Sequence, residues 1–386
     1  MRIAIDARWI FREISGIGTY TCELIRELAR LDHDNEYLLI FRDPAVQART
    51  LAETGAGKAA NFRAVRVPYG VFSPLGQLRL PWLLRRERVE VFHSTNFMMP
   101  LFMGRGRNRP RCVVTIHDVI PLIFPDHAPR SKKSRAMGLY RRLMMLIGRR
   151  ADRILTVSRA SAQDIIAQLH IPPEHAGKVQ AIYNGVSGRY SPLPDMPEKG
   201  PEAARKILYV GRFDPYKNLA VLIRAFAAAR AQVKFPLTLV VAGAPDPRYP
   251  EAPQLARELG VNDAIDWRGY VTHDQLVSLY QECDVLAHPS RYEGFGLQIL
   301  EAMASGLPVI CSRAGALPEV AGDAAVLRDP DDLDGWAGAI AWVLGTPVQQ
   351  QAMRRQGLAQ AARFQWPETA RAVLAAYRQA AAGTDR

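Results

Sequence analysis

Residues 291–310 read RYEGFGLQILEAMASGLPVI, which predicts a glycine-containing turn, then a helix, then a strand. Gly294 and Gly296 let the backbone approach a ligand closely, and free amides at a helix start favour anionic or hydroxyl-rich ligands. Glu293 precedes the turn and Glu301 follows eight positions later. At 1.5 Å per helical residue they lie about 12 Å apart, which suits two hydroxyl-bearing groups of one ligand better than one catalytic pair. A structural turn with ordinary surface glutamates stays an equal alternative.

The rest of the chain alternates short apolar runs with helical patterns. This alternation predicts an α/β fold with parallel sheets covered by helices on both faces. Strands are expected at residues 3–6, 37–41, 64–67, 89–92, 112–117, 151–157, 206–210, 237–242, 284–288 and 307–312, and helices at 20–31, after Ser158 and at 218–230. Residues 186–203 are rich in proline and glycine and read as a linker.

The linker divides the chain into two doubly wound domains. We expect an N-terminal, acceptor-side domain over residues 1–190 and a C-terminal, donor-binding domain over 204–365. Residues 366–386 are expected to form a helix that returns toward the first domain. Such a pair of domains places a ligand in the cleft between them.

Composition and charge restrict the class of protein. The chain has 386 residues, of which 48% are hydrophobic and 23% charged, as in ordinary globular proteins. Its four cysteines are far apart in sequence, which argues against a disulfide framework or a zinc knuckle. The first seven residues read as a strand rather than a signal peptide, and no run nears the roughly 20 apolar residues of a membrane span. A cytoplasmic protein is therefore expected.

The positive charge lies in one half of the chain. Residues 1–200 carry 31 Lys and Arg against 18 Asp and Glu, whereas residues 201–386 carry 19 against 20. Such an asymmetry indicates that the first half faces an anionic partner. A membrane surface, a phosphorylated acceptor and nucleic acid all remain open.

Two motifs follow predicted strands. In GRFDPYKN, residues 211–218, Arg212 and Lys217 suit a pyrophosphate at a strand's carboxyl end; a solvated basic loop is the alternative. In VVTIHDVIPLIFP, residues 113–125, a strand delivers His117 and Asp118 to its end. A histidine that merely hydrogen-bonds at a strand terminus is the alternative there.

The first loop and a basic segment carry weaker signals. SGIGTY, residues 15–20, has Gly16 and Gly18 but lacks the third glycine of a nicotinamide site. Between Arg130 and Arg159, apolar residues at helical spacing are flanked by four arginines: Arg141, Arg142, Arg149 and Arg150. This helix either lies on an anionic membrane or packs on the N-terminal sheet with its arginines in solvent, and both can hold together.

Glu293 and Glu301, with seven residues between them, resemble the signature of the retaining glycosyltransferases of family 4. That resemblance implies the GT-B architecture of two facing Rossmann-like domains. It implies that Glu293 binds the hydroxyls of the donor sugar and Glu301 the nucleotide ribose. The backbone around the turn would hold the sugar and phosphates, through Gly294, Phe295, Gly296 and Leu297.

The remaining motifs occur in the family's order over nearly the whole chain. By the same resemblance, Arg212 and Lys217 bind the donor diphosphate, Gly16 and Gly18 approach it from the other domain, and His117 lies beside the donor sugar with Asp118 next to it. The string DARW at residues 6–9, with the motif around His117, resembles bacterial enzymes that add mannose to lipid-linked saccharides.

The resemblance implies transfer of a sugar from a nucleotide sugar, with retention at the anomeric carbon and without a required metal or cofactor. GDP-mannose is the expected donor and a UDP-sugar the alternative. The acceptor would be a saccharide or a lipid-linked saccharide in surface polysaccharide synthesis, at the inner face of the cell membrane. Two rivals stay open: a nucleotide-sugar epimerase or hydrolase of the same fold, and a basic nucleic-acid-binding protein. Only the charge supports the second rival, because the sequence has no aromatic RNA-stacking or helix-turn-helix motif.

Overall fold

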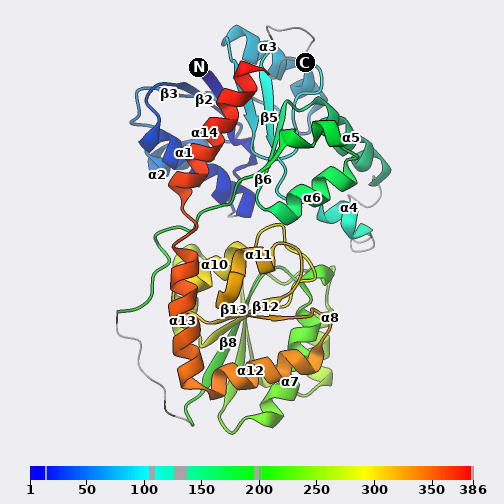
Figure 1. Cartoon of the computed structure of the whole chain (residues 1–386), viewed down its shortest axis with the longest axis vertical. Helices are drawn as coiled ribbons and strands as arrows, with labels where there is room; N and C mark the ends of the chain where they lie inside the picture. Colours follow the sequence, from blue (N-terminus) through cyan, green and yellow to red (C-terminus); the bar gives the residue numbers. More distant parts are fainter. Residues whose placement is uncertain (14, 104–108, 126–136, 195–199, 201, 384–386) are drawn as a thin grey trace. The chain divides into compact units, whose positions relative to one another are not determined.

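The computed structural model describes residues 1–13, 15–103, 109–125, 137–194, 200 and 202–383. The chain folds into two units (Figure 1). Met1–Ile123, Ala136–Gly185 and Gln365–Arg386 form the first, and Phe124–Arg135 with Val186–Phe364 form the second. No helix within the described residues combines the length and apolar character that a bilayer span requires.

The first unit is built on a parallel sheet in the order β3-β2-β1-β4-β5-β6-β7. Its strands are β1 (Arg2–Asp6), β2 (Glu36–Phe41), β3 (Phe62–Arg66), β4 (Val91–Ser94), β5 (Arg111–Thr115), β6 (Arg153–Thr156) and β7 (Val179–Ala181). Its helices are α1 (Gly16–Leu31), α2 (Pro44–Thr54), α3 (Pro74–Arg86), α4 (Ile120–Ile123), α5 (Met137–Arg150), α6 (Arg159–Gln168) and α14 (Trp366–Ala382). Because all strand pairs are parallel, the strands' carboxyl ends share one edge of the sheet and their amino ends the other.

Alternate residues of each strand enter cores on opposite faces of this sheet. Ile3 and Ile5 pack with α1 and α14, whereas Ala4 packs with Phe92 and with Met144 of α5. Both faces are therefore buried, which explains why the strands read as nearly continuous apolar runs.

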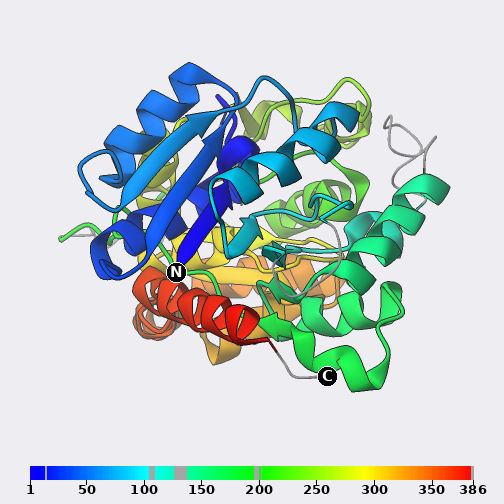
Figure 2. The same cartoon turned by 90° about the horizontal axis from the view of Figure 1, so that it is seen from above.

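The last helix of the chain belongs to the first unit. Figures 1 and 2 show α14, in red, beside α1. The Trp366 ring lies 6.2 Å from that of Tyr20 in α1, and the Tyr377 hydroxyl lies 2.6 Å from His93 Nδ1 in β4. Segments 284 residues apart in sequence thus share one core, to which α14 contributes its apolar face.

The second unit has a parallel sheet in the order β10-β9-β8-β11-β12-β13. Its strands are β8 (Arg205–Val210), β9 (Leu237–Ala242), β10 (Ile265–Gly269), β11 (Val285–His288), β12 (Val309–Ser312) and β13 (Ala325–Arg328). Its helices are α7 (Leu219–Gln232), α8 (Glu251–Glu258), α9 (His273–Glu282), α10 (Leu297–Ala304), α11 (Leu317–Ala321), α12 (Leu333–Gly345) and α13 (Pro347–Ala361). Central β8 and β11 are neighbours, so the loops that follow them meet at the carboxyl edge.

Several predicted boundaries were wrong by a few residues. The first helix begins at Gly16 rather than Tyr20, because Ser15 Oγ accepts from Gly18 N (3.1 Å) and caps it. Strand β4 starts at Val91 rather than at residue 89, and β5 ends at Thr115, two residues before His117. Three strands escaped prediction: β7 has only three residues, β10 contains Asp266 and Arg268, and β13 is only partly buried.

Candidate active site

In the second unit, the two strongest sequence motifs lie side by side at the sheet's carboxyl edge. The loop after β8 carries Arg212 and Lys217, and the loop after β11 carries Glu293. Arg291 N donates to the carbonyl of Tyr216 (2.7 Å), which joins the two loops directly. Neighbouring central strands thus bring together residues about eighty positions apart in sequence.

A buried polar cluster forms where these loops meet. Lys217 Nζ lies 2.7 Å from Glu293 Oε1 and 3.0 Å from Oε2, and His288 Nε2 lies 2.8 Å from the same Oε1. Lys217 is 8% exposed, Glu293 7% and His288 0%. A carboxylate this deeply buried is tolerated only with such partners.

The cluster keeps Glu293 ionised. Burial alone raises the pKa of Glu293, but the Lys217 ammonium and the His288 hydrogen bond outweigh it and leave that pKa below its usual range. Burial lowers the pKa of Lys217, but Glu293 outweighs it and leaves that pKa raised. His288 Nδ1 has no hydrogen-bond partner within the described residues, so the imidazole contacts Glu293 through Nε2.

Two glycines fix the backbone around Glu293. Gly296 has φ of +99° and caps α10; a Cβ there would lie 2.7 Å from the Leu317 side chain. Gly315 has φ of +53°, and its Cβ would lie 2.6 Å from the Glu293 carbonyl oxygen. Both positions therefore require glycine. The Phe295 ring packs against the Phe364 ring, with 6.0 Å between their centroids. The part of this turn suited to a ligand is therefore its backbone, from Gly294 to Leu297.

Glu301 has partners of its own. Its Oε2 accepts from the Tyr280 hydroxyl (2.9 Å) on α9. Burial raises the pKa of Glu301, and the hydroxyls of Tyr280 and Tyr190 oppose that rise only in part. The two glutamates are thus held by different side chains.

Arg212 is the accessible member of the predicted cation pair. Its side chain is 70% exposed and lies 2.9 Å from Asp214 Oδ2. Its Nη2 is 3.5 Å from the Tyr216 hydroxyl. Lys217, in contrast, is enclosed and engaged with Glu293. The sequence placed the two cations together but did not indicate that one of them already has a carboxylate partner.

In the first unit, the predicted glycines lie in the first turn of α1. Gly16 is the first residue of this helix, and a Cβ there would meet nothing within 4 Å. The amide of Gly18 already donates a hydrogen bond to Ser15 Oγ, the N-cap of this helix. The uncapped amides of this helix start are the groups that favour an anion.

His117 and Asp118 lie at the carboxyl edge of the first sheet. His117 Nε2 lies 3.0 Å from the carbonyl of Thr95, and the Tyr20 ring stands edge-on to the imidazole at 4.9 Å. Burial lowers the pKa of His117 to about 4, against a small opposing effect of the Thr95 carbonyl. We therefore assign a neutral imidazole that donates from Nε2 and keeps Nδ1 as an acceptor. Asp118 Oδ1 accepts from Ile120 N (3.1 Å) and so orders the turn into α4.

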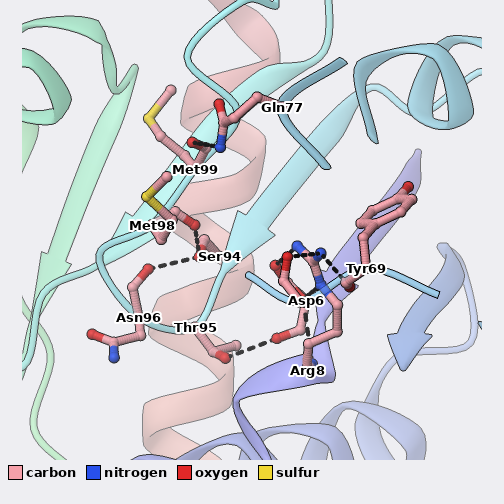
Figure 3. A network of polar contacts seen from close by, with 10 residues as sticks. Asp6, Arg8, Tyr69, Gln77, Ser94, Thr95, Asn96, Met98 and Met99 are labelled. Carbon is pink, nitrogen blue, oxygen red and sulfur yellow. Dashed lines mark hydrogen bonds and ion pairs between the residues drawn. The ribbon is translucent and has the colours of Figure 1, made fainter. Parts of the chain in front are cut away.

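A buried ion pair supports this edge of the first sheet (Figure 3). Arg8 Nη2 lies 2.6 Å from Asp6 Oδ2, with both side chains almost wholly buried, and Thr95 Oγ1 donates to the Asp6 carbonyl (3.1 Å). Thr95 is the residue whose carbonyl holds His117. Sequence reasoning used DARW only for a resemblance and missed this structural role.

A second polar chain was also missed. His93 Nε2 lies 2.8 Å from Thr115 Oγ1, which lies 3.2 Å from the Tyr20 hydroxyl. Through His93 Nδ1 this chain continues to Tyr377 of α14. The only available signal was a histidine inside the apolar run VFHS, residues 91–94.

The predicted basic helix is α5. Its apolar side is packed: Met144 and Ile147 are fully buried, with Tyr140 and Leu143 partly buried beside them. Four arginines remain exposed: Arg141, Arg142, Arg149 and Arg150. The face around Met144 and Ile147 is therefore unavailable to lipid, whereas the four arginines and Leu139, which is 71% exposed, remain accessible. The part of the segment at 130–136 lies outside the described residues.

Comparison with known proteins places this geometry among sugar transferases. The family model described as "Glycosyltransferase Family 4" matches residues 14–187, and that described as "Glycosyl transferases group 1" matches residues 195–360. The chain is 30% identical to O-antigen chain mannosyltransferase B of Escherichia coli, over 98% of this chain and all of that one. It is 32% identical to the MMP alpha-(1->4)-mannosyltransferase of Mycolicibacterium hassiacum, over 99% of both chains.

Among solved structures, sucrose-phosphate synthase of Thermosynechococcus elongatus superimposes with a TM-score of 0.76 at 21% identity. The match covers 99% of this chain and 100% of that one. At this identity the likeness concerns the fold, and it confirms the predicted architecture of two Rossmann-like domains.

Proposed function

This chain belongs to the glycosyltransferases of family 4, and from that premise we propose that it transfers mannose from GDP-mannose to a saccharide or lipid-linked acceptor, with retention at the anomeric carbon. Mannosyltransferases that match it end to end support the choice of sugar. A UDP-sugar is the alternative donor. The acceptor would be an intermediate of surface polysaccharide synthesis.

One observation carries the proposed site: the ionised Glu293 carboxylate is held between Lys217 and His288 at the carboxyl edge of the second sheet. A fixed carboxylate accepts strongly from sugar hydroxyls. Glu301, held by Tyr280, would accept from the ribose. The amide groups of Gly294 to Leu297 would complete the contacts with sugar and phosphates.

The chemical step displaces the nucleoside diphosphate by an acceptor hydroxyl. Negative charge grows on the leaving diphosphate, and the exposed Arg212 guanidinium would stabilise it. Lys217 would act through its charge and its hold on Glu293. The leaving phosphate itself would accept the acceptor's proton, so no side chain would serve as general base. The acceptor oxygen would bond to the anomeric carbon on the face that the phosphate leaves, so no protein nucleophile would be needed. His117 Nδ1 would accept a hydrogen bond from a hydroxyl of the sugar and so position the sugar.

A donor panel tests this function. Release of nucleoside diphosphate would be measured with GDP-mannose and with UDP-sugars, each with and without a saccharide acceptor. We expect acceptor-dependent release from GDP-mannose and an α-linked product by NMR. Acceptor-independent turnover would instead identify a hydrolase or epimerase, and preference for a UDP-sugar would replace mannose by the alternative donor.

We also propose that the protein works at the inner face of the membrane, attached through exposed arginines of α5. Arg141 and Arg142 are solvent-exposed beside the packed face of this helix. Each basic residue near an anionic surface contributes about 1 kcal/mol, which salt screens. Reversal of Arg141 and Arg142 to Glu should weaken sedimentation with anionic vesicles while leaving circular dichroism unchanged. Wild-type protein that ignores such vesicles at low salt would exclude this attachment.

A further inference from the structure

A cavity of about 1100 Å³ opens at the opposite edge of the first sheet, where β5, β6 and β7 begin. We name it the amino-edge pocket. Six cationic side chains line it: Arg109, Arg111, Arg149, Arg150, Arg153 and Lys178. The last turn of α14 lines one side, through Gln379 and Ala380.

The topology explains this gathering of cations. Arg111 and Arg153 are the first residues of β5 and β6, and Lys178 directly precedes β7. Because these adjacent strands are parallel, their first residues share one edge. Helix α5 leads back to the start of β6, so its last residues, Arg149 and Arg150, reach the same edge.

The charge of the amino-edge pocket is incompletely balanced. Among the residues that the structure describes, its lining holds six cations against two carboxylates, Asp152 and Glu174, an excess of four positive charges. Asp152 is shared: Arg109 binds it through two contacts of 2.7 Å, and Arg111 Nη1 lies 3.5 Å from it. The Arg149 side chain forms no ion pair within the described residues. Several cations facing one solvent-filled space make a favourable field for an anion.

We propose that the amino-edge pocket binds a phosphate-bearing ligand with at least two negative charges. Guanidinium groups match phosphate oxygens through paired hydrogen bonds, and four of the pocket's cations come from strand or helix ends that hold them in place. Phe102 on the rim is 63% exposed, and its ring lies 5.9 Å from the Arg150 guanidinium. The phosphate therefore belongs either to a free phosphorylated compound or to a lipid head group whose apolar part meets Phe102.

This site is distinct from the donor site. His117 and the start of α1 lie at the carboxyl edge, and His117 lies six positions after Arg111 along β5 and its extension. At about 3.3 Å per extended residue, the two edges are roughly 20 Å apart. A ligand in the amino-edge pocket can thus bind together with the donor, and the proposal does not depend on the donor's identity.

Calorimetric titration with inorganic pyrophosphate tests the site on the full chain. The pocket variant is Arg149→Gln with Arg153→Gln. The matched control is Arg141→Gln with Arg142→Gln, which removes two exposed charges from α5 outside the amino-edge pocket. We expect the pocket variant to lose at least tenfold in affinity and the control to stay within twofold of wild type. Should the pocket variant fail to fold by circular dichroism, Lys178→Gln replaces it.

Equal affinities in the pocket variant and the control would overturn the proposal, as would binding that Arg212→Ala alone abolishes. Vesicles of phosphatidylglycerol and of phosphatidylcholine then separate the two phosphate sources. A lipid ligand predicts that pyrophosphate displaces the protein from phosphatidylglycerol vesicles and that the pocket variant binds these vesicles less than wild type does. A free phosphorylated ligand predicts pocket-dependent pyrophosphate binding, with vesicle binding of the pocket variant equal to that of wild type.

Discussion

Lys217 Nζ lies 2.7 Å from Glu293 Oε1, and neither side chain is more than a tenth exposed. The sequence assigned these residues to different ends of the donor, the diphosphate and the sugar. Their pairing holds in place the Glu293 carboxylate, for which we propose the sugar-binding role. It also means that replacing either residue by a neutral one leaves the other as a buried charge without its counter-charge.

The first prediction follows from that pairing. Lys217→Met should destabilise the fold by about 3–5 kcal/mol, because Glu293 loses its buried counter-charge. The double variant Lys217→Met with Glu293→Gln should recover part of this loss, since no unpaired charge remains. Urea unfolding of the two single variants, the double variant and wild type gives the coupling energy. Additive losses would show that the two side chains do not stabilise each other.

Replacing Arg212 should affect stability much less than replacing Lys217, because the Arg212 side chain is exposed. Arg212→Ala is expected to leave the unfolding free energy within about 0.5 kcal/mol of wild type. It should raise the activation free energy of turnover by about 3–4 kcal/mol. Arg268→Ala is the matched control, an exposed arginine of the same unit paired with Asp266. Normal turnover in folded Arg212→Ala would remove the diphosphate role.

The elements that sequence reasoning found, and those it missed, differ in local pattern. Strands β8 and β9 are buried apolar runs and stand out by themselves. Strand β10 mixes Asp266 and Arg268 into its span, so its place in the sheet depends on neighbours that no local pattern reveals. The candidate glutamates were found because their spacing matches a known signature.

Partners across long sequence separations could not be predicted. Glu293 contacts Lys217 from 76 positions away, and His93 contacts Tyr377 from 284. Such contacts arise from strand order and from α14 joining the first unit, which periodicity does not specify. His288 lies five residues from Glu293, yet it looked like an ordinary residue at the end of a strand.

The third prediction separates the two glutamates by ligand. Glu293→Ala should weaken binding of the sugar nucleotide more than that of the bare nucleoside diphosphate, because only the former carries the sugar. Glu301→Ala should weaken both, since the ribose is common to them. Tyr280→Phe, which removes the hydroxyl that holds Glu301, should resemble a mild Glu301→Ala. Calorimetric titrations with both ligands test this, and identical profiles for the two alanine variants would remove the distinction.

The last prediction concerns acid stability of the first unit. Burial lowers the pKa of His93 to about 3 and that of His117 to about 4, whereas both ionise near 6.5 in the unfolded chain. Between these limits the unfolded chain binds more protons than the folded chain, so stability is full above pH 6.5 and falls as the pH drops. At about pH 5 the loss due to His93 alone should reach about 2 kcal/mol. Urea unfolding between pH 7 and pH 5 measures it, before carboxylates such as Glu293 begin to titrate. His93→Asn should roughly halve the dependence, even if it lowers stability at every pH, because one of the two buried histidines that gain a proton on unfolding is gone. His33→Gln is the control, since His33 is exposed; an equal slope in His93→Asn and wild type would show that burial of His93 does not govern the acid response.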